Sequence, residues 1–180
     1  PDDANSDPII LPYPMHPTAY RNRKFEEFEQ LRIKKRENRI LFSGNTDPVA
    51  YQHPIIHDIY QKLNRVEVVN TVIENFKSPD LIIVENQEDI TSNFSHYFSG
   101  IKLYLWQWSP AASKSLAIRI PNEEWHSFLA GGDFYLCCPG IVIPLSHNAI
   151  EAMSVGTIPI LSYPELFHPG LKHGINCIVY

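Results

Sequence analysis

The 180-residue chain lacks the features that define several large classes of protein. It has only three cysteines, two of them adjacent, and no C-x-x-C pair, so neither a disulfide framework nor a zinc site is indicated. The odd count favours a reducing compartment with buried thiols. No apolar run approaches the roughly 20 residues of a membrane helix. The phosphate-binding signatures G-x-G-x-x-G and G-x-x-x-x-G-K-[ST] are also missing, which argues against the common dinucleotide and P-loop classes.

Positive charge is scarce as well. The formal net charge is −5, and the one long basic run, RIKKRENR at 32–39, is typical of a solvated helix face. Because duplex binding needs a clustered cationic surface, the composition argues against nucleic acid as a partner. Hydrophobic residues make up 44% of the chain, which is typical of a globular protein with a buried core.

The N-terminal part of the chain differs in composition from the rest. Prolines and acidic residues dominate the first twenty positions and predict an extended connector. An amphipathic helix is expected over 23–38, with Phe25 and Phe28 at helical spacing. The chain opens without a methionine and stops within a strand-like pattern, so we expect a piece of a longer protein. We interpret 1–38 as connector and helix, and 39–180 as one domain that is incomplete at its C-terminus.

Short apolar segments alternate with helix-like segments through this domain. Strands are predicted at 39–45, 66–70, 81–85, 115–120, 133–138, 157–161 and 175–180, with 103–108 either a strand or a core segment. Helices are predicted at 53–64, at 121–132 with Asn122 as N-cap, and at 148–155 with Gly156 at the exit. Apolar strands that alternate with helices of about ten residues indicate a parallel sheet covered on both faces. The predicted fold class is therefore α/β, a Rossmann-like, doubly wound and mostly parallel sheet.

Ligands of such sheets bind beyond the carboxyl ends of the strands, and the predicted strand at 39–45 ends in a glycine loop, SGN at 43–45. Gly44 lets the backbone approach a ligand closely, and Asn45 tolerates unusual dihedral angles. The same residues are typical of a plain tight turn. A phosphate cradle and a simple turn both remain open for this segment.

A second segment leaves a strand through Pro139 and Gly140 and enters a helix at 146–148. A helix N-terminus carries unpaired N–H groups and a partial positive charge, so it can hold a phosphate. Glu151 lies on the same side as His147, four residues on, where a carboxylate can accept hydrogen bonds from a ribose or sugar diol. Ordinary capping, with a carboxylate favoured by the helix dipole, explains the same residues.

The segments FYLCCPG (134–140) and SHNAIEAMSVGTIPIL (146–161) resemble the donor-site signature of GT-B glycosyltransferases. Within that class they are most similar to the exostosin-like group. In those enzymes a strand ends in a proline–glycine loop, and a helix carries E-A-(M/L)-x-x-G followed by (T/C/V)-(I/V)-P-(V/I). The resemblance is strongest over 122–180, and RILFSGN (39–45) fits the opening strand of the nucleotide-sugar domain. The motif marks the class and not the substrate.

The resemblance implies one half of a GT-B enzyme, which binds a nucleoside-diphosphate sugar and needs no further cofactor. The sugar would pass to a glycan or glycolipid acceptor held by a missing N-terminal domain. Glu151 would hold the ribose or sugar hydroxyls, while Ser146, His147 and Asn148 would line the phosphate and sugar pocket. Gly44 would lie near the diphosphate or near the cleft between the two domains.

Departures from the family pattern bear on the mechanism that the resemblance implies. Ile143 stands eight residues before Glu151, where retaining members often carry an acid, so an inverting transfer is expected. Its general base would come from the other domain. No D-x-D motif is present, so the transfer is expected to be metal-independent. Arg119 is a candidate to pair with the diphosphate, although a solvent-facing or salt-bridged arginine fits that position too.

Two other functions stay open. One is a non-catalytic sugar-nucleotide-binding module, and the other is a sugar-nucleotide epimerase-like enzyme with a further catalytic His or Glu in the same domain. The expected location is the cytoplasm or the cytoplasmic face of a membrane, with peripheral association, or the Golgi lumen in a eukaryote.

Overall fold

The computed structural model describes residues 13–36, 39–76, 79–84, 102–108 and 120–180. These residues form a six-stranded sheet with the order β2-β3-β1-β4-β5-β6, in which every pairing is parallel. The strands are β1 (Arg39–Asn45), β2 (Leu81–Ile83), β3 (Lys102–Trp108), β4 (Phe134–Leu136), β5 (Ile158–Leu161) and β6 (Ile178–Val179). The expected Rossmann-like parallel α/β sheet is therefore confirmed.

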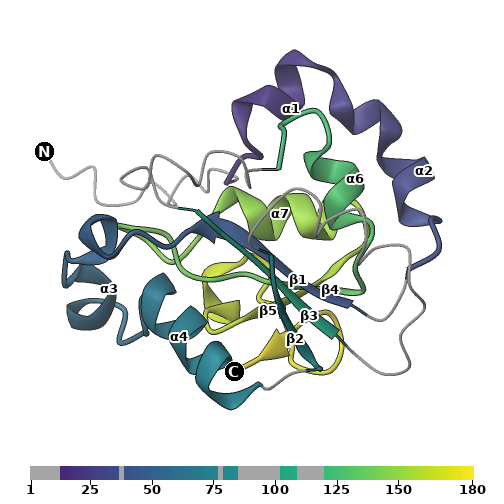
Figure 1. Cartoon of the computed structure of the whole chain (residues 1–180). Coiled ribbons are helices and arrows are strands. Elements are labelled where there is room, and N and C mark those ends of the chain that lie inside the picture. Colours follow the sequence, from purple (N-terminus) through teal and green to yellow (C-terminus); the bar gives the residue numbers. More distant parts are fainter. Residues whose placement is uncertain (1–12, 37–38, 77–78, 85–101, 109–119) are drawn as a thin grey trace, which may run out of the picture.

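Helices cover both faces of this sheet. They are α1 (Pro17–Arg21), η1 (Lys24–Glu27), α2 (Phe28–Arg32), η2 (Pro48–Tyr51), α3 (Ile55–Asp58), α4 (Arg65–Asn75), α6 (Trp125–Leu129), α7 (His147–Ser154) and η4 (Pro164–Leu166). Figure 1 shows α1, α2, α6 and α7 on one side of the strands and α3 and α4 on the other. None of the helices in the described part of the chain is long and apolar enough to span a bilayer.

The central strands place alternate side chains in two separate cores. Leu41 and Tyr135 join the cluster beneath α2, α6 and α7, whereas Phe42 and Leu136 join the cluster beneath α4. Burial on both faces explains why these strands read as continuous apolar runs in the sequence. All three cysteine residues are buried, as predicted.

The middle position of β1 creates the crevice at which ligands of open α/β sheets bind. Its neighbours are β3 on one side and β4 on the other. The strands that follow β1 lie on the β3 side, whereas those that follow β4 lie on the opposite side, so the order of the strands reverses between β1 and β4. The segment that was predicted as a glycine loop after β1 is still strand, because Gly44 and Asn45 pair with Gln107 and Trp108 of β3.

The segment 66–70, which was predicted as a strand, instead lies within α4. Asn64 forms a capping box with Glu67: the Asn64 side chain accepts from the Glu67 N–H at 3.1 Å, and a Glu67 carboxylate oxygen accepts from the Asn64 N–H at 2.7 Å. Val68 and Val69 are buried against the sheet. Capping and one apolar face outweigh the β propensity of the valines.

Two predicted helices are much shorter than expected because the backbone turns. Helix α3 covers only Ile55–Asp58, since Gln61 adopts a left-handed conformation with φ of 53°. Ile59, just after this short helix, is 66% exposed. The helix expected at 23–38 is divided into η1 and α2 after a left-handed Arg23, although Phe28 still enters the core. Residues 17–21 are helical and not an extended connector.

The remaining elements follow the prediction with shifted ends. Helix α6 begins later than predicted, with Glu124 and not Asn122 at its N-cap position. Helix α7 and its C-terminal glycine are confirmed, with φ of +80° at Gly156. Strands β2 to β6 occupy the predicted segments but are mostly shorter, and the strand expected at 115–120 lies almost entirely outside the described residues.

Part of the basic run at 32–39 has a structural role and is not simply a solvated face. Arg32 donates from Nε to the carbonyl of Ser154 at 2.7 Å, and Arg36 donates to the carbonyl of Val155. These two carbonyls lie at the C-terminal end of α7, where cations are favoured by the helix dipole. The arginines therefore hold the segment after α2 against α7.

We predict that Asn64→Ala lowers the free energy of unfolding by about 0.5–2 kcal/mol, because a helix N-cap is lost. Asn70→Ala is the matched control, since Asn70 is exposed on the same helix. It should leave stability unchanged or slightly raised, given the helix propensity of alanine. Urea unfolding measures both variants. Equal effects of the two substitutions would contradict the assignment of α4.

Candidate functional site

A cavity of about 610 Å³ lies at the carboxyl ends of β1 and β4. Its wall combines the end of β1, the loop after β4, the first turn of α7 and the segment 13–18, which we call the strap. Side chains from η2, α4 and the beginning of α6 complete it. Segments separated by more than a hundred positions in the sequence thus meet at the place where the topology opens the sheet.

Most of the predicted site residues lie on this wall. They are Gly44, Asn45, Gly140, Ser146, His147, Asn148 and Glu151. Pro139 is buried and is not among the lining residues. Arg119 lies outside the described residues. Seven of the nine predicted residues thus line one cavity, and their individual roles depend on the geometry described below.

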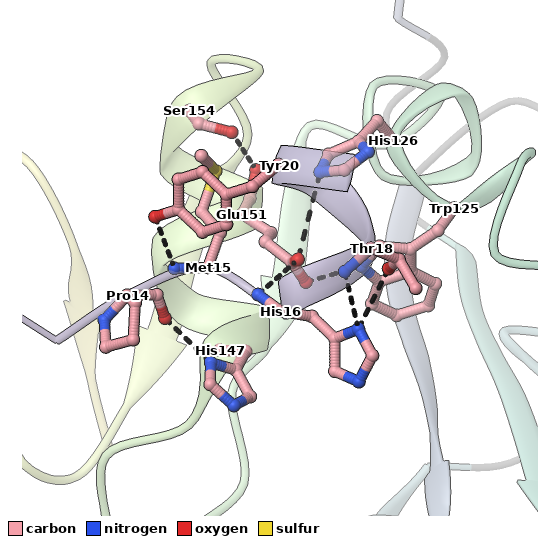
Figure 2. Close-up of polar contacts among 10 residues, drawn as sticks. All are labelled: Pro14, Met15, His16, Thr18, Tyr20, Trp125, His126, His147, Glu151 and Ser154. Atoms are coloured by element: carbon pink, nitrogen blue, oxygen red, sulfur yellow. Dashed lines mark hydrogen bonds and ion pairs between the residues drawn. The ribbon is translucent and has the colours of Figure 1, made fainter. Parts of the chain in front are cut away.

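Glu151 lies on the cavity wall, but its carboxylate is already engaged by protein donors. The residue is 1% exposed, and both oxygens accept hydrogen bonds from protein donors (Figure 2). The backbone N–H of His16 donates to Oε1 at 3.0 Å, and the indole Nε1–H of Trp125 donates to Oε2 at 2.7 Å. Burial raises the pKa of Glu151, and these two hydrogen bonds oppose the rise. Glu151 is thus engaged inside the protein and is not offered to a ligand.

A buried histidine completes the surroundings of this carboxylate. The Nε2 atom of His126 lies 3.9 Å from Oε1 of Glu151, and the His126 ring packs 4.9 Å from the ring of Phe28. Burial and the neighbouring Lys24 lower the pKa of His126, which favours a neutral imidazole. The pair therefore does not form a full ion pair at neutral pH.

The strap is fixed on α7 at a second point. His147 Nδ1 donates to the carbonyl of Pro14 at 2.7 Å, and the Tyr13 ring stacks on the His147 ring with centroids 5.2 Å apart. The side chain of Met15 packs against the core. The strap is therefore an integral wall of the cavity, a role that the proline-rich composition did not indicate.

The first turn of α7 is tied to the end of β1 through a buried tyrosine. Asn148 Nδ2 donates to the hydroxyl of Tyr135 at 3.1 Å, and that hydroxyl donates to the Ser43 carbonyl at 2.8 Å. Burial raises the pKa of Tyr135, so the phenol stays protonated and keeps donating. Ser146 occupies the N-cap position without a side-chain capping bond, so α7 begins at the cavity without the cap that was expected.

Two glycines have steric reasons to be where they are. A Cβ atom on Gly140 would lie 2.6 Å from the carbonyl oxygen of Ile143, so the loop after β4 could not close on itself. A Cβ atom on Gly44 would lie 3.3 Å from Nη1 of Arg65. Gly44 therefore leaves room beside the end of β1 for a guanidinium group. The Asn45 side chain accepts from the N–H of Asp47 at 2.8 Å and shapes the turn that follows.

Arg65 is one of the lining residues that sequence reasoning missed. Its guanidinium lies over the ring of Tyr51, with Cζ 5.2 Å from the centroid, and its buried Nε has no hydrogen-bond partner. No carboxylate in the described part of the chain forms a salt bridge with it. The pattern Asn64-x-x-Glu67 is a capping-box signature, and it would have placed Arg65 at the start of a helix.

The charges of the lining suit an anionic ligand with polar groups. Arg65, His16 and His147 line the cavity, and the only carboxylate among the described lining residues is the engaged Glu151. No group of three or more potential metal ligands occurs among the described residues. No protein-family model, curated protein or solved structure matches the chain.

We predict that Trp125→Phe lowers the free energy of unfolding by about 1–3 kcal/mol at pH 8, because a buried carboxylate oxygen loses its donor. Folding already favours protonated Glu151, so the stability contributed by this group falls as pH rises through its raised pKa. Losing the Trp125 donor raises that pKa further, and the destabilisation should therefore be smaller at pH 5 than at pH 8. Urea unfolding at both pH values measures the difference.

Tyr20→Phe is the control for this experiment. It removes an exposed hydroxyl that accepts from the N–H of Met15 at 3.2 Å in the same region. Its effect on stability should be small and independent of pH. A penalty for Trp125→Phe that does not change with pH would contradict the role assigned to the Glu151 carboxylate.

Proposed function

We propose that the chain is the nucleotide-sugar-binding half of a GT-B glycosyltransferase and that the cavity beyond β1 and β4 binds a nucleoside-diphosphate sugar. One observation carries the proposal: Arg65, without a carboxylate partner among the described residues, lines the same cavity as the N-terminus of α7. A guanidinium and the positive end of a helix both favour phosphate oxygens. The glycosyltransferase-like sequence motif covers this same wall and supports the choice of ligand.

The diphosphate occupies the space between Arg65 and the first turn of α7. Gly44 allows the guanidinium to stand beside the end of β1, and the stacked Tyr51 ring restricts its movement. Arg65 thereby takes the role that the sequence had suggested for Arg119. Because a guanidinium presents its donors in a rigid fork, it matches two phosphate oxygens at once.

The hydroxyl-binding role moves away from Glu151 in this proposal. With both carboxylate oxygens engaged, Glu151 acts through the strap and Trp125, whose positions it sets. The cavity offers other groups for ribose or sugar hydroxyls, among them the amide of Asn122 and the hydroxyl of Thr18. Glu151 is thus a positioning residue for the wall of the site.

The transfer follows from this arrangement in one balanced step. The acceptor hydroxyl oxygen forms a bond to the anomeric carbon as the bond from that carbon to the phosphate oxygen breaks. Arg65 and the α7 dipole offset the negative charge that develops on the departing diphosphate. The hydroxyl proton passes to a general base, which we assign to the acceptor domain of the complete enzyme. The outcome is inversion at the anomeric carbon without a metal ion.

One observation favours a second candidate, a non-catalytic sugar-nucleotide-binding module. Among the described lining residues the only carboxylate is buried and engaged, so no acid that the structure describes on this wall is free to take part in the reaction. The complete protein distinguishes the two functions. Release of free nucleoside diphosphate in the presence of acceptor glycans favours the transferase, whereas binding without turnover favours the module.

We predict that Arg65→Gln weakens binding of UDP- or GDP-sugars by about 10- to 150-fold, equivalent to about 1.5–3 kcal/mol for a charged hydrogen bond. Isothermal titration calorimetry on the complete protein measures this loss. Arg21→Gln is the matched control, because Arg21 is an exposed arginine at the end of α1 that does not line the cavity. Equal affinity of the two variants, or no binding of any nucleotide sugar, would contradict the proposed function.

A further inference from the structure

Two imidazole rings stand side by side on the cavity wall and are held in opposite tautomers. His147 Nδ1 lies 2.7 Å from the carbonyl oxygen of Pro14. A carbonyl oxygen only accepts hydrogen bonds, so Nδ1 of His147 carries a proton. A neutral imidazole has one N–H, and the remaining ring nitrogen, Nε2, therefore presents a lone pair.

The second ring has the reverse arrangement. His16 Nδ1 accepts from the backbone N–H of Thr18 at 3.4 Å and lies 2.8 Å from the Thr18 hydroxyl. A backbone N–H only donates, so Nδ1 holds the lone pair and Nε2 of neutral His16 carries the proton. The two rings meet edge to face with centroids 5.7 Å apart, and Figure 2 shows both on the same side of the strap.

These tautomers determine how each ring meets an anion. Neutral His16 presents an N–H at Nε2 and donates to a phosphate oxygen without any change in its charge. Neutral His147 presents a lone pair at Nε2, which repels such an oxygen. Because Nδ1–H of His147 is already committed to Pro14, this ring can donate into the cavity only as the doubly protonated imidazolium.

We propose that an anionic ligand in this cavity is bound by His147 as imidazolium and by His16 as neutral imidazole, so that each binding event takes up one proton at His147. The inference rests on the proposed function, which supplies the ligand class, a nucleoside-diphosphate sugar. His147 is the first residue of α7, where the partial positive charge of the helix N-terminus attracts the same phosphate.

Charged and titratable groups face His147 from the strap and from α7 itself. Burial raises the pKa of the Tyr13 phenol stacked on the ring, which keeps that phenol neutral. His16 is neutral in its observed tautomer. Glu151 lies one turn further along α7, and a coulombic interaction with His147 opposes the rise that burial causes in the pKa of Glu151.

The other elements around the cavity add one fixed charge. Arg65 of α4 lines the same cavity, and its positive charge would repel an imidazolium at His147. A phosphate bound between Arg65 and His147 offsets this repulsion. On α6, Trp125 is uncharged, and His126 lies against Glu151. The lining residues of the loop after β4 have no titratable side chains. An anion between Arg65 and His147 therefore favours the imidazolium form of His147 in the complex.

Calorimetry of the complete protein with UDP-glucose, GDP-mannose and sodium sulfate tests the proposal. Each probe keeps an essentially constant charge near pH 8, so any proton taken up from the buffer on binding is bound by the protein. Titrations at pH 8 in two buffers of different ionisation enthalpy give the number of protons. We expect uptake approaching one proton, and an association constant that falls by up to about tenfold per pH unit in the alkaline range.

Matched asparagine variants assign that proton to one ring. His147→Asn retains an N–H that can donate to Pro14 but cannot titrate, so proton uptake should disappear. His16→Asn retains an acceptor for the Thr18 N–H, so uptake should persist. Binding without proton uptake in the unmodified protein, or uptake that survives in His147→Asn, would overturn the inference and leave the proposed function standing.

Two further outcomes separate the inference from the proposed function. Sulfate binding with proton uptake, but no binding of either nucleotide sugar, would overturn the proposed function and support the inference. Long-range ¹H–¹⁵N spectra of the ligand-free protein read the tautomers directly, whether or not a variant folds. An Nε2–H tautomer at neutral His147 would overturn the inference, and the Nδ1–H tautomer would support it.

Discussion

The buried carboxylate of Glu151 is the interaction on which the rest of the cavity depends. It holds the strap through the N–H of His16 and holds α6 through the indole of Trp125, while its own backbone is part of α7. A carboxylate this far from water is tolerated only when its oxygens are hydrogen-bonded. Removing either donor therefore leaves one oxygen of the buried Glu151 carboxylate without a hydrogen bond. We expect the contacts of the cavity wall to weaken first, while the packing of the sheet is unaffected.

The orientation of α7 connects this anchor to the chemistry of the site. The first turn points into the crevice between β1 and β4, where Asn148 and Tyr135 fix it to the end of β1. The last turn is held by Arg32 and Arg36, whose charges complement the negative end of the helix. The negative end of the α7 dipole therefore contacts the two arginines, and the positive end faces the cavity, which Arg65 and two histidines also line.

The sheet was predictable from the sequence, and much of the site was not. Burial on both faces makes central strands such as β1 and β4 continuously apolar, which is a local signal. The strap contacts α7 across more than a hundred positions, and no local pattern records that. Arg65 was missed because neighbouring valines suggested a strand, although the capping box at Asn64 was readable. Glu151 was singled out from the sequence, but residue type and spacing do not tell whether a carboxylate binds a ligand or other groups of the protein.

The most direct test of this account is a crystal structure of the complete protein with UDP or GDP bound. The account predicts a diphosphate in contact with Arg65, His147 and the first turn of α7, with the N–H of His16 still on Glu151. A nucleotide whose hydroxyls bind the Glu151 carboxylate after the strap has moved away would contradict it, as would a nucleotide bound outside the cavity.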